Sequence, residues 1–144
     1  MNTEELLGRA KRIHFEELCN DVADSIRPIH RVWATSGKVE PFIIVWPSEP
    51  IPLRDGSALS GPQFKELPDD EKRWPSIMED EVRRLRAQAL LFVHETPQNV
   101  RALLETSYST RAWVYPKEKH GDAWRLGQPL VSDDEEYLLS LIHI

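Results

Sequence analysis

The stretch from Ser76 to Glu95 constrains the fold most, because a helical pattern there runs almost directly into a buried-strand pattern. Ser76 and Glu79 have the spacing of a capping box at a helix start. Apolar residues then recur at helical spacing, at Met78, Val82, Leu85 and Ala89. The next four residues are Leu-Leu-Phe-Val, a short apolar run typical of a covered strand. The pattern therefore predicts a helix over 76–89 followed at once by a strand over 90–93.

Similar patterns predict the elements that precede this unit. A helix over 4–26 follows from one apolar stripe, made by Phe15, Leu18, Cys19, Val22 and Ile26. Pro28 ends it, since the residue before a proline avoids the helical region. A hairpin is expected next, with strands over 29–35 and 39–46 joined by a Ser-Gly-Lys turn at 36–38.

Residues 47–75 hold six of the 11 prolines, so we expect a long loop there, with one helical turn near 69–73. Such loops are often functional, although a plain surface excursion explains the composition equally well. Strand patterns over 109–115 and 123–131 predict a second hairpin. The end of the chain, 137–144, fits either a helix or a buried strand.

Together these elements predict an α+β fold of one domain over residues 1–144. The sheet should be antiparallel or mixed, with four to five strands packed by the two main helices. The expected order is α-β-β-α-β-β-β with a short C-terminal element. A chain of 144 residues can bury a core of its own at this size.

Composition disfavours several classes of function. The net charge of −6 argues against non-specific binding to nucleic acid or to an anionic membrane. The longest apolar runs have five residues, too few to span a bilayer, and the first residues lack the apolar region of a signal peptide. Cys19 is the single cysteine, so an intrachain disulfide is impossible and a cytoplasmic location is expected.

The candidates for catalysis are His94 and Glu95, which close the predicted strand at 90–93. A histidine beside a carboxylate can act in acid–base chemistry, and the loop over 47–75 could then serve as a lid. The competing interpretation is a solvated Glu95 and a His94 paired with a backbone carbonyl. No spacing of histidines and the one cysteine matches a metal site, and no motif calls for a cofactor.

A second set of candidates combines aromatic and basic side chains in the second predicted hairpin: Arg111, Trp113, Tyr115, Trp124 and Arg125. Strand alternation puts Trp113 and Tyr115 on the face opposite Ala112 and Val114. If the small residues pack inward, the rings form an outward partner surface. The alternative is that a helix covers the rings.

These observations favour a small acidic protein-binding domain, such as an adaptor, an inhibitor or an accessory factor. On this hypothesis, replacing Trp113 and Trp124 with alanine abolishes partner binding without unfolding the domain. Two alternatives are a small hydrolase using His94 and Glu95, and a binder of single-stranded nucleic acid that stacks bases on the hairpin rings. An exposed sheet edge could also pair two copies of the chain.

Overall fold

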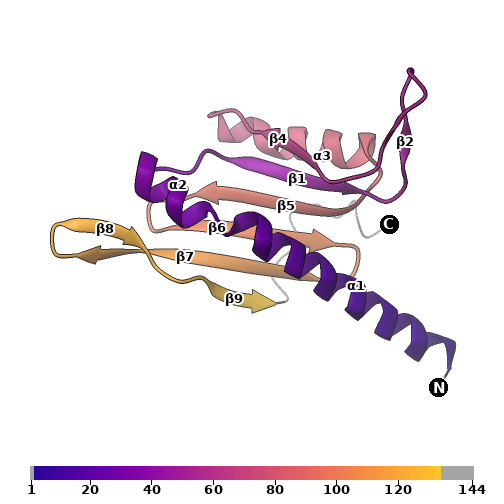
Figure 1. Ribbon diagram of the computed structural model, residues 1–144, viewed down its shortest axis with the longest axis horizontal. Helices are drawn as coiled ribbons and strands as arrows, with labels where there is room; N and C mark the ends of the chain where they lie inside the picture. Colours follow the sequence, from indigo (N-terminus) through magenta and orange to yellow (C-terminus); the bar gives the residue numbers. More distant parts are fainter. Residues whose placement is uncertain (1, 134–144) are drawn as a thin grey trace.

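The computed structural model describes residues 2–133, and a seven-stranded sheet forms its centre (Figure 1). The strands run in the order β4-β1-β5-β6-β7, with β8 and β9 both paired to β7, and every pairing is antiparallel. Their bounds are β1 (Phe42–Pro47), β4 (Gln63–Glu66), β5 (Ala87–Glu95), β6 (Asn99–Thr106), β7 (Thr110–His120), β8 (Ala123–Leu126) and β9 (Leu130–Asp133). The α+β class is confirmed, with more strands than the four to five expected.

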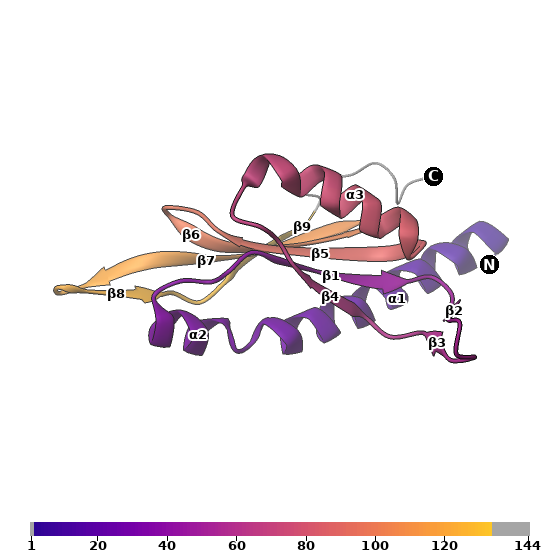
Figure 2. The same ribbon diagram turned by 90° about the horizontal axis from the view of Figure 1, so that it is seen from above.

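Helices cover both faces of the sheet (Figure 2). On one face lie α1 (Thr3–Ile26) and the short α2 (Ile29–Ser36). On the other lies α3 (Trp74–Arg84), preceded by a 3-10 turn, η1 (Glu71–Arg73).

Strand β5 shows how one run of residues serves two cores. Leu91 and Val93 pack with α1 and α2, whereas Leu90 and Phe92 pack with α3. Side chains alternate along a strand, so a continuous apolar run is what a strand covered on both faces requires. The sequence-based prediction of a buried strand here is confirmed.

The first helix also agrees with its prediction, and its stripe from Phe15 to Ile26 is buried. The expected strand over 29–35 is wrong, because these residues form α2. Gly37, read as a hairpin turn, instead ends that helix with φ of 74° and donates its N–H to the Trp33 carbonyl. Ile29 and Trp33, one helical turn apart, pack on the core, and this packing overrides the strand propensity of the segment.

The predicted helix over 76–89 is shifted toward the N-terminus. Helix α3 begins at Trp74, and Pro75 lies in its first turn, where a missing N–H costs nothing. The helix ends at Arg84, and Ala89 belongs to β5. The expected capping box at Ser76 is therefore wrong, and Asp70 caps the preceding turn η1 by accepting from the Lys72 N–H.

Segment 47–75 is more structured than a loop. It contains a two-stranded ribbon, β2 (Ile51–Pro52) with β3 (Ala58–Leu59), the sheet strand β4, and the helical turn expected near 69–73, observed as η1.

The second hairpin differs as well. Strand β7 continues to His120 and turns at Gly121, where φ is 66°, so β8 ends at Leu126 and residues 130–133 form the separate strand β9. The expectation for 137–144 lies outside the described residues.

The two edges of the sheet differ in whether other strands pair with them. Strands β8 and β9 cover the outer edge of β7, pairing with residues 117–120 and 111–114. Strand β4 lies at the opposite edge, and none of the described strands pairs with its outer side.

Candidate protein-binding groove beside strand β4

The aromatic residues expected to face outward are covered. Trp113 and Tyr115 are only 6% and 4% exposed and lie in the core beneath α1 and α2, where His30 packs edge-on against Tyr115. The outward-facing arrangement is therefore wrong for these two rings, and the alternative, coverage by helices, is what the structure has. The two rings fill the core, because the face of β7 that carries them is covered by α1 and α2.

Arg111 is engaged in ion pairs within the chain. Its guanidinium contacts the carboxylates of Glu16 and Asp133 and lies 5.3 Å from the centre of the Phe15 ring. The hydrogen bonds that Arg111 donates to Asp133 and then to Glu16 raise the pKa of Arg111 above its ordinary value. The residue thus ties α1, β7 and β9 together. Of the five predicted binding residues, Trp124 and Arg125, both on β8, are exposed.

His94 and Glu95 are adjacent in sequence but project from opposite faces of the sheet. His94 stacks on Phe92, with ring centroids 4.5 Å apart, on the α3 side. Burial, and then the charge of Arg101, lower the pKa of His94. Glu95 points to the α1 and α2 side, so the two groups do not converge on one substrate position.

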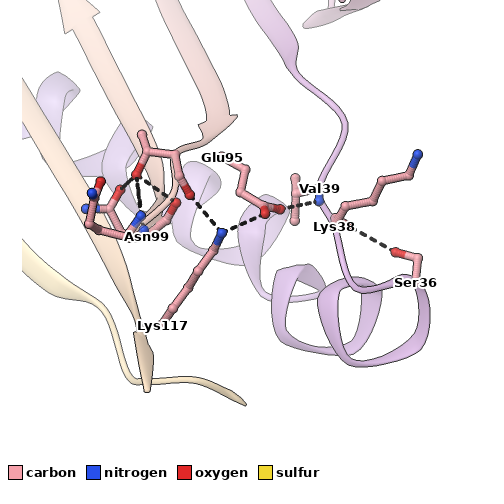
Figure 3. A network of polar contacts seen from close by, with 8 residues as sticks. Ser36, Lys38, Val39, Glu95, Asn99 and Lys117 are labelled. Carbon is pink, nitrogen blue, oxygen red and sulfur yellow. Dashed lines mark hydrogen bonds and ion pairs between the residues drawn. The ribbon is translucent and has the colours of Figure 1, made fainter. Parts of the chain in front are cut away.

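Glu95 instead belongs to a polar network that holds the linker between α2 and β1 (Figure 3). Its carboxylate accepts the Val39 N–H at 2.8 Å and pairs with Lys117 Nζ at 2.8 Å. Lys117 also donates to the Thr96 carbonyl, at the turn between β5 and β6. The side chains of the pair are mostly buried, so the linker is fastened to the sheet at Val39.

That linker forms one wall of an open groove of about 440 Å³. Apolar lining residues come from α2, the linker, strand β1 and the edge strand β4, and they include Ile29, Val32, Val39, Pro41, Phe42 and Phe64. Two of these side chains face solvent to an unusual degree, with Val32 46% and Phe64 60% exposed. The Phe64 and Phe42 rings touch, with centroids 5.2 Å apart.

Charge around the groove is slightly acidic. Lys38 is the one cation among its lining residues, and its Nζ pairs with the Glu40 carboxylate at 2.8 Å. Glu66, on β4, also lines the groove and has no ion pair within residues 2–133.

Sequence reasoning missed this groove because it placed α2 in a strand and β4 in a loop. One signal was available. Phe64 alternates with the polar residues Gln63 and Lys65 between Pro62 and Pro68, a pattern typical of a short edge strand.

Comparisons with known proteins add no family to this description: no protein-family model, curated protein or solved structure matches the chain. None of the helices in the described part is both long enough and apolar enough to cross a bilayer. Residues 2–133 also hold no cluster of three or more metal-ligating side chains.

Proposed function

We propose that this chain is a small protein-binding domain, acting as an adaptor, an inhibitor or an accessory factor, and that the groove beside β4 receives its partner. The observation that carries the proposal is the exposure of Phe64, on β4, and Val32, on α2, in the lining of one apolar groove. Isolated exposed apolar residues are common on protein surfaces, whereas several gathered around a concave site indicate an interaction surface.

The lining chemistry favours a protein partner over nucleic acid. A phosphate backbone requires several free cations, and the groove offers only Lys38, whose charge Glu40 already balances. Aliphatic or aromatic side chains of a partner would cover Phe64 and Val32, with each well-covered side chain contributing about 1–2 kcal/mol.

The groove is also held in shape before any partner arrives. Its linker wall is fixed through Val39 to the Glu95–Lys117 pair, and its helical wall ends at the glycine cap of α2. A preformed site loses less conformational entropy on binding. The proposed compartment is the cytoplasm, where the unpaired and buried Cys19 would stay reduced.

The test is selection of a phage-displayed library of random 12-residue peptides against the immobilised protein. Enriched peptides should bind the wild type and lose at least ten-fold in affinity for the double variant Val32→Asp/Phe64→Ala. Val32 is 46% and Phe64 60% exposed, so we expect the variant to fold, which circular dichroism and urea unfolding would establish.

The matched control is Trp124→Ala, which removes an exposed ring of β8 instead. It should leave binding unchanged. Failure to enrich any peptide, or equal binding to the wild type and the Val32/Phe64 variant, would overturn the proposal.

A further inference from the structure

The backbone of β4 indicates how a partner would bind in the groove, and this inference rests on the proposed function. The Leu67 N–H donates to the Pro41 carbonyl at 3.0 Å, and the register opposes Phe42 to Glu66 and Ile43 to Lys65. In antiparallel pairs, hydrogen-bonded positions alternate. Leu67 occupies a hydrogen-bonded position, and so does Lys65, two residues before it, which directs its backbone groups toward β1. Phe64 and Glu66 occupy the alternate positions and direct their backbone groups away from the sheet.

The side chains of the same two residues point into the groove, whereas Lys65 points the other way and reaches Glu81 of α3 at 3.5 Å. Among residues 2–133, therefore, no strand pairs with the outward backbone groups of Phe64 and Glu66, and the side chains of both residues line the groove. A strand added here would place every second side chain over the groove.

We propose that the occupant is an extended segment of another protein that adds to β4 as an eighth strand. Its groove-facing side chains include an apolar residue, which meets Phe64 and Val32, and a basic residue two positions away, which meets Glu66.

The reason to expect a basic residue in the partner segment is charge complementarity with Glu66. Glu66 has no ion pair in the described chain, and Glu40 is already shared with Lys38. A lysine or arginine directly across from Glu66 would form a cross-strand pair at the groove rim.

A second copy of this chain fits the edge less well. Antiparallel pairing of β4 with itself, centred on Lys65, would put two lysines directly opposite each other, which is destabilising. Shifting the centre to Phe64 would oppose Glu66 to Pro62, which has no N–H to donate. The edge is therefore better suited to a different sequence.

The test uses fluorescence anisotropy with two labelled seven-residue peptides and the full chain. The first, Thr-Val-Thr-Lys-Thr-Val-Thr, presents valine and lysine on one strand face in either direction. The second replaces the lysine with glutamate. We expect the lysine peptide to bind at least ten-fold more tightly at 50 mM salt, and the preference to shrink at 500 mM salt.

Two variants of Glu66 distinguish the contribution of its backbone N–H to peptide binding from that of its carboxylate. Glu66→Ala should reduce the preference for lysine but keep residual binding. Glu66→Pro also removes the outward N–H without touching the ladder to β1, and should abolish binding of both peptides. Glu79→Gln, an exposed carboxylate of α3 paired with Arg83, is the matched control and should change nothing.

The outcomes separate the two proposals. Equal binding of both peptides would overturn the proposal that the partner segment carries a basic residue, and would still support the groove as the binding site. Binding that survives Glu66→Pro, or absence of binding by the lysine peptide while library peptides still bind, would overturn strand addition. Sedimentation showing a dimer that Glu66→Pro dissociates would overturn the choice of occupant. Failure of both the library and the peptides would overturn the proposed function itself.

Discussion

Lys117 and Glu95 form an ion pair with Nζ and Oε2 2.8 Å apart, and their side chains are only 15% and 21% exposed. The pair joins β7 to the end of β5, and the other carboxylate oxygen of Glu95 holds the backbone of Val39. One ion pair thereby connects the sheet to a wall of the groove.

Lys117→Met should lower the free energy of unfolding by about 1.5–3 kcal/mol, because it leaves a largely buried carboxylate with one hydrogen bond fewer. Urea unfolding of Lys117→Met, Glu95→Gln and the double variant measures the loss and the coupling between the two residues. The double variant should recover part of the loss. Strict additivity of the two single changes would contradict a direct interaction.

Trp113 and Trp124 should respond oppositely to replacement with alanine. Trp113 is buried in the core on the α1 side, so Trp113→Ala should cost about 3–5 kcal/mol. Trp124 is 57% exposed, so Trp124→Ala should cost less than about 1 kcal/mol. Urea unfolding followed by circular dichroism compares them. Similar losses for the two variants would be inconsistent with their different burial.

His94 should make stability depend on pH. Burial and the charge of Arg101 hold its pKa below the ordinary value of 6.5, so the folded state disfavours the protonated ring. Between the folded and unfolded pKa values the unfolded chain binds more protons, and stability rises with pH. The contribution is fully present above about pH 6.5 and is lost as the pH falls toward the folded pKa.

The measurement is urea unfolding at pH 7.5 and 5.5 for the wild type and His94→Gln. The variant should lose less stability between these two pH values, since the other titrating groups are common to both proteins. An equal loss in both would show that His94 titrates alike in the folded and unfolded chain.

Arg86 marks a strained connection between α3 and β5. Its φ of 49° lies in the left-handed region, which glycine adopts readily and other residues adopt at a cost. Arg86→Gly should therefore stabilise the protein by about 0.5–1 kcal/mol, measured by thermal or urea unfolding. Arg83→Gly, one turn earlier inside the helix, is the control and should destabilise by about 1 kcal/mol. Destabilisation by both changes would rule out strain at Arg86.

The groove depends on two elements that sequence patterns did not identify. Residues 29–36 carry valine, isoleucine and tryptophan, which suit a strand, yet the segment is a helix that packs Ile29 and Trp33 on the core. Residues 63–66 carry only the short alternation around Phe64, which indicates an edge strand without indicating its partner, and the structure pairs them with β1. Neither contact can be deduced from local periodicity.

The amino-acid sequence alone determined the elements that are long or that are buried on both faces. The helix ending at Ile26, the apolar strand around Leu90–Val93 and the α+β class all follow from the spacing of apolar residues, since that spacing must match the period of the element that buries it. Tertiary structure decided which sides of those elements are covered. It buried Trp113 and Tyr115 beneath α1 and α2, and it separated His94 from Glu95 across the sheet. It also left Phe64 and Val32 exposed in the lining of one groove. Exposure is a property of neighbours distant in the chain, and no local pattern records where those neighbours lie.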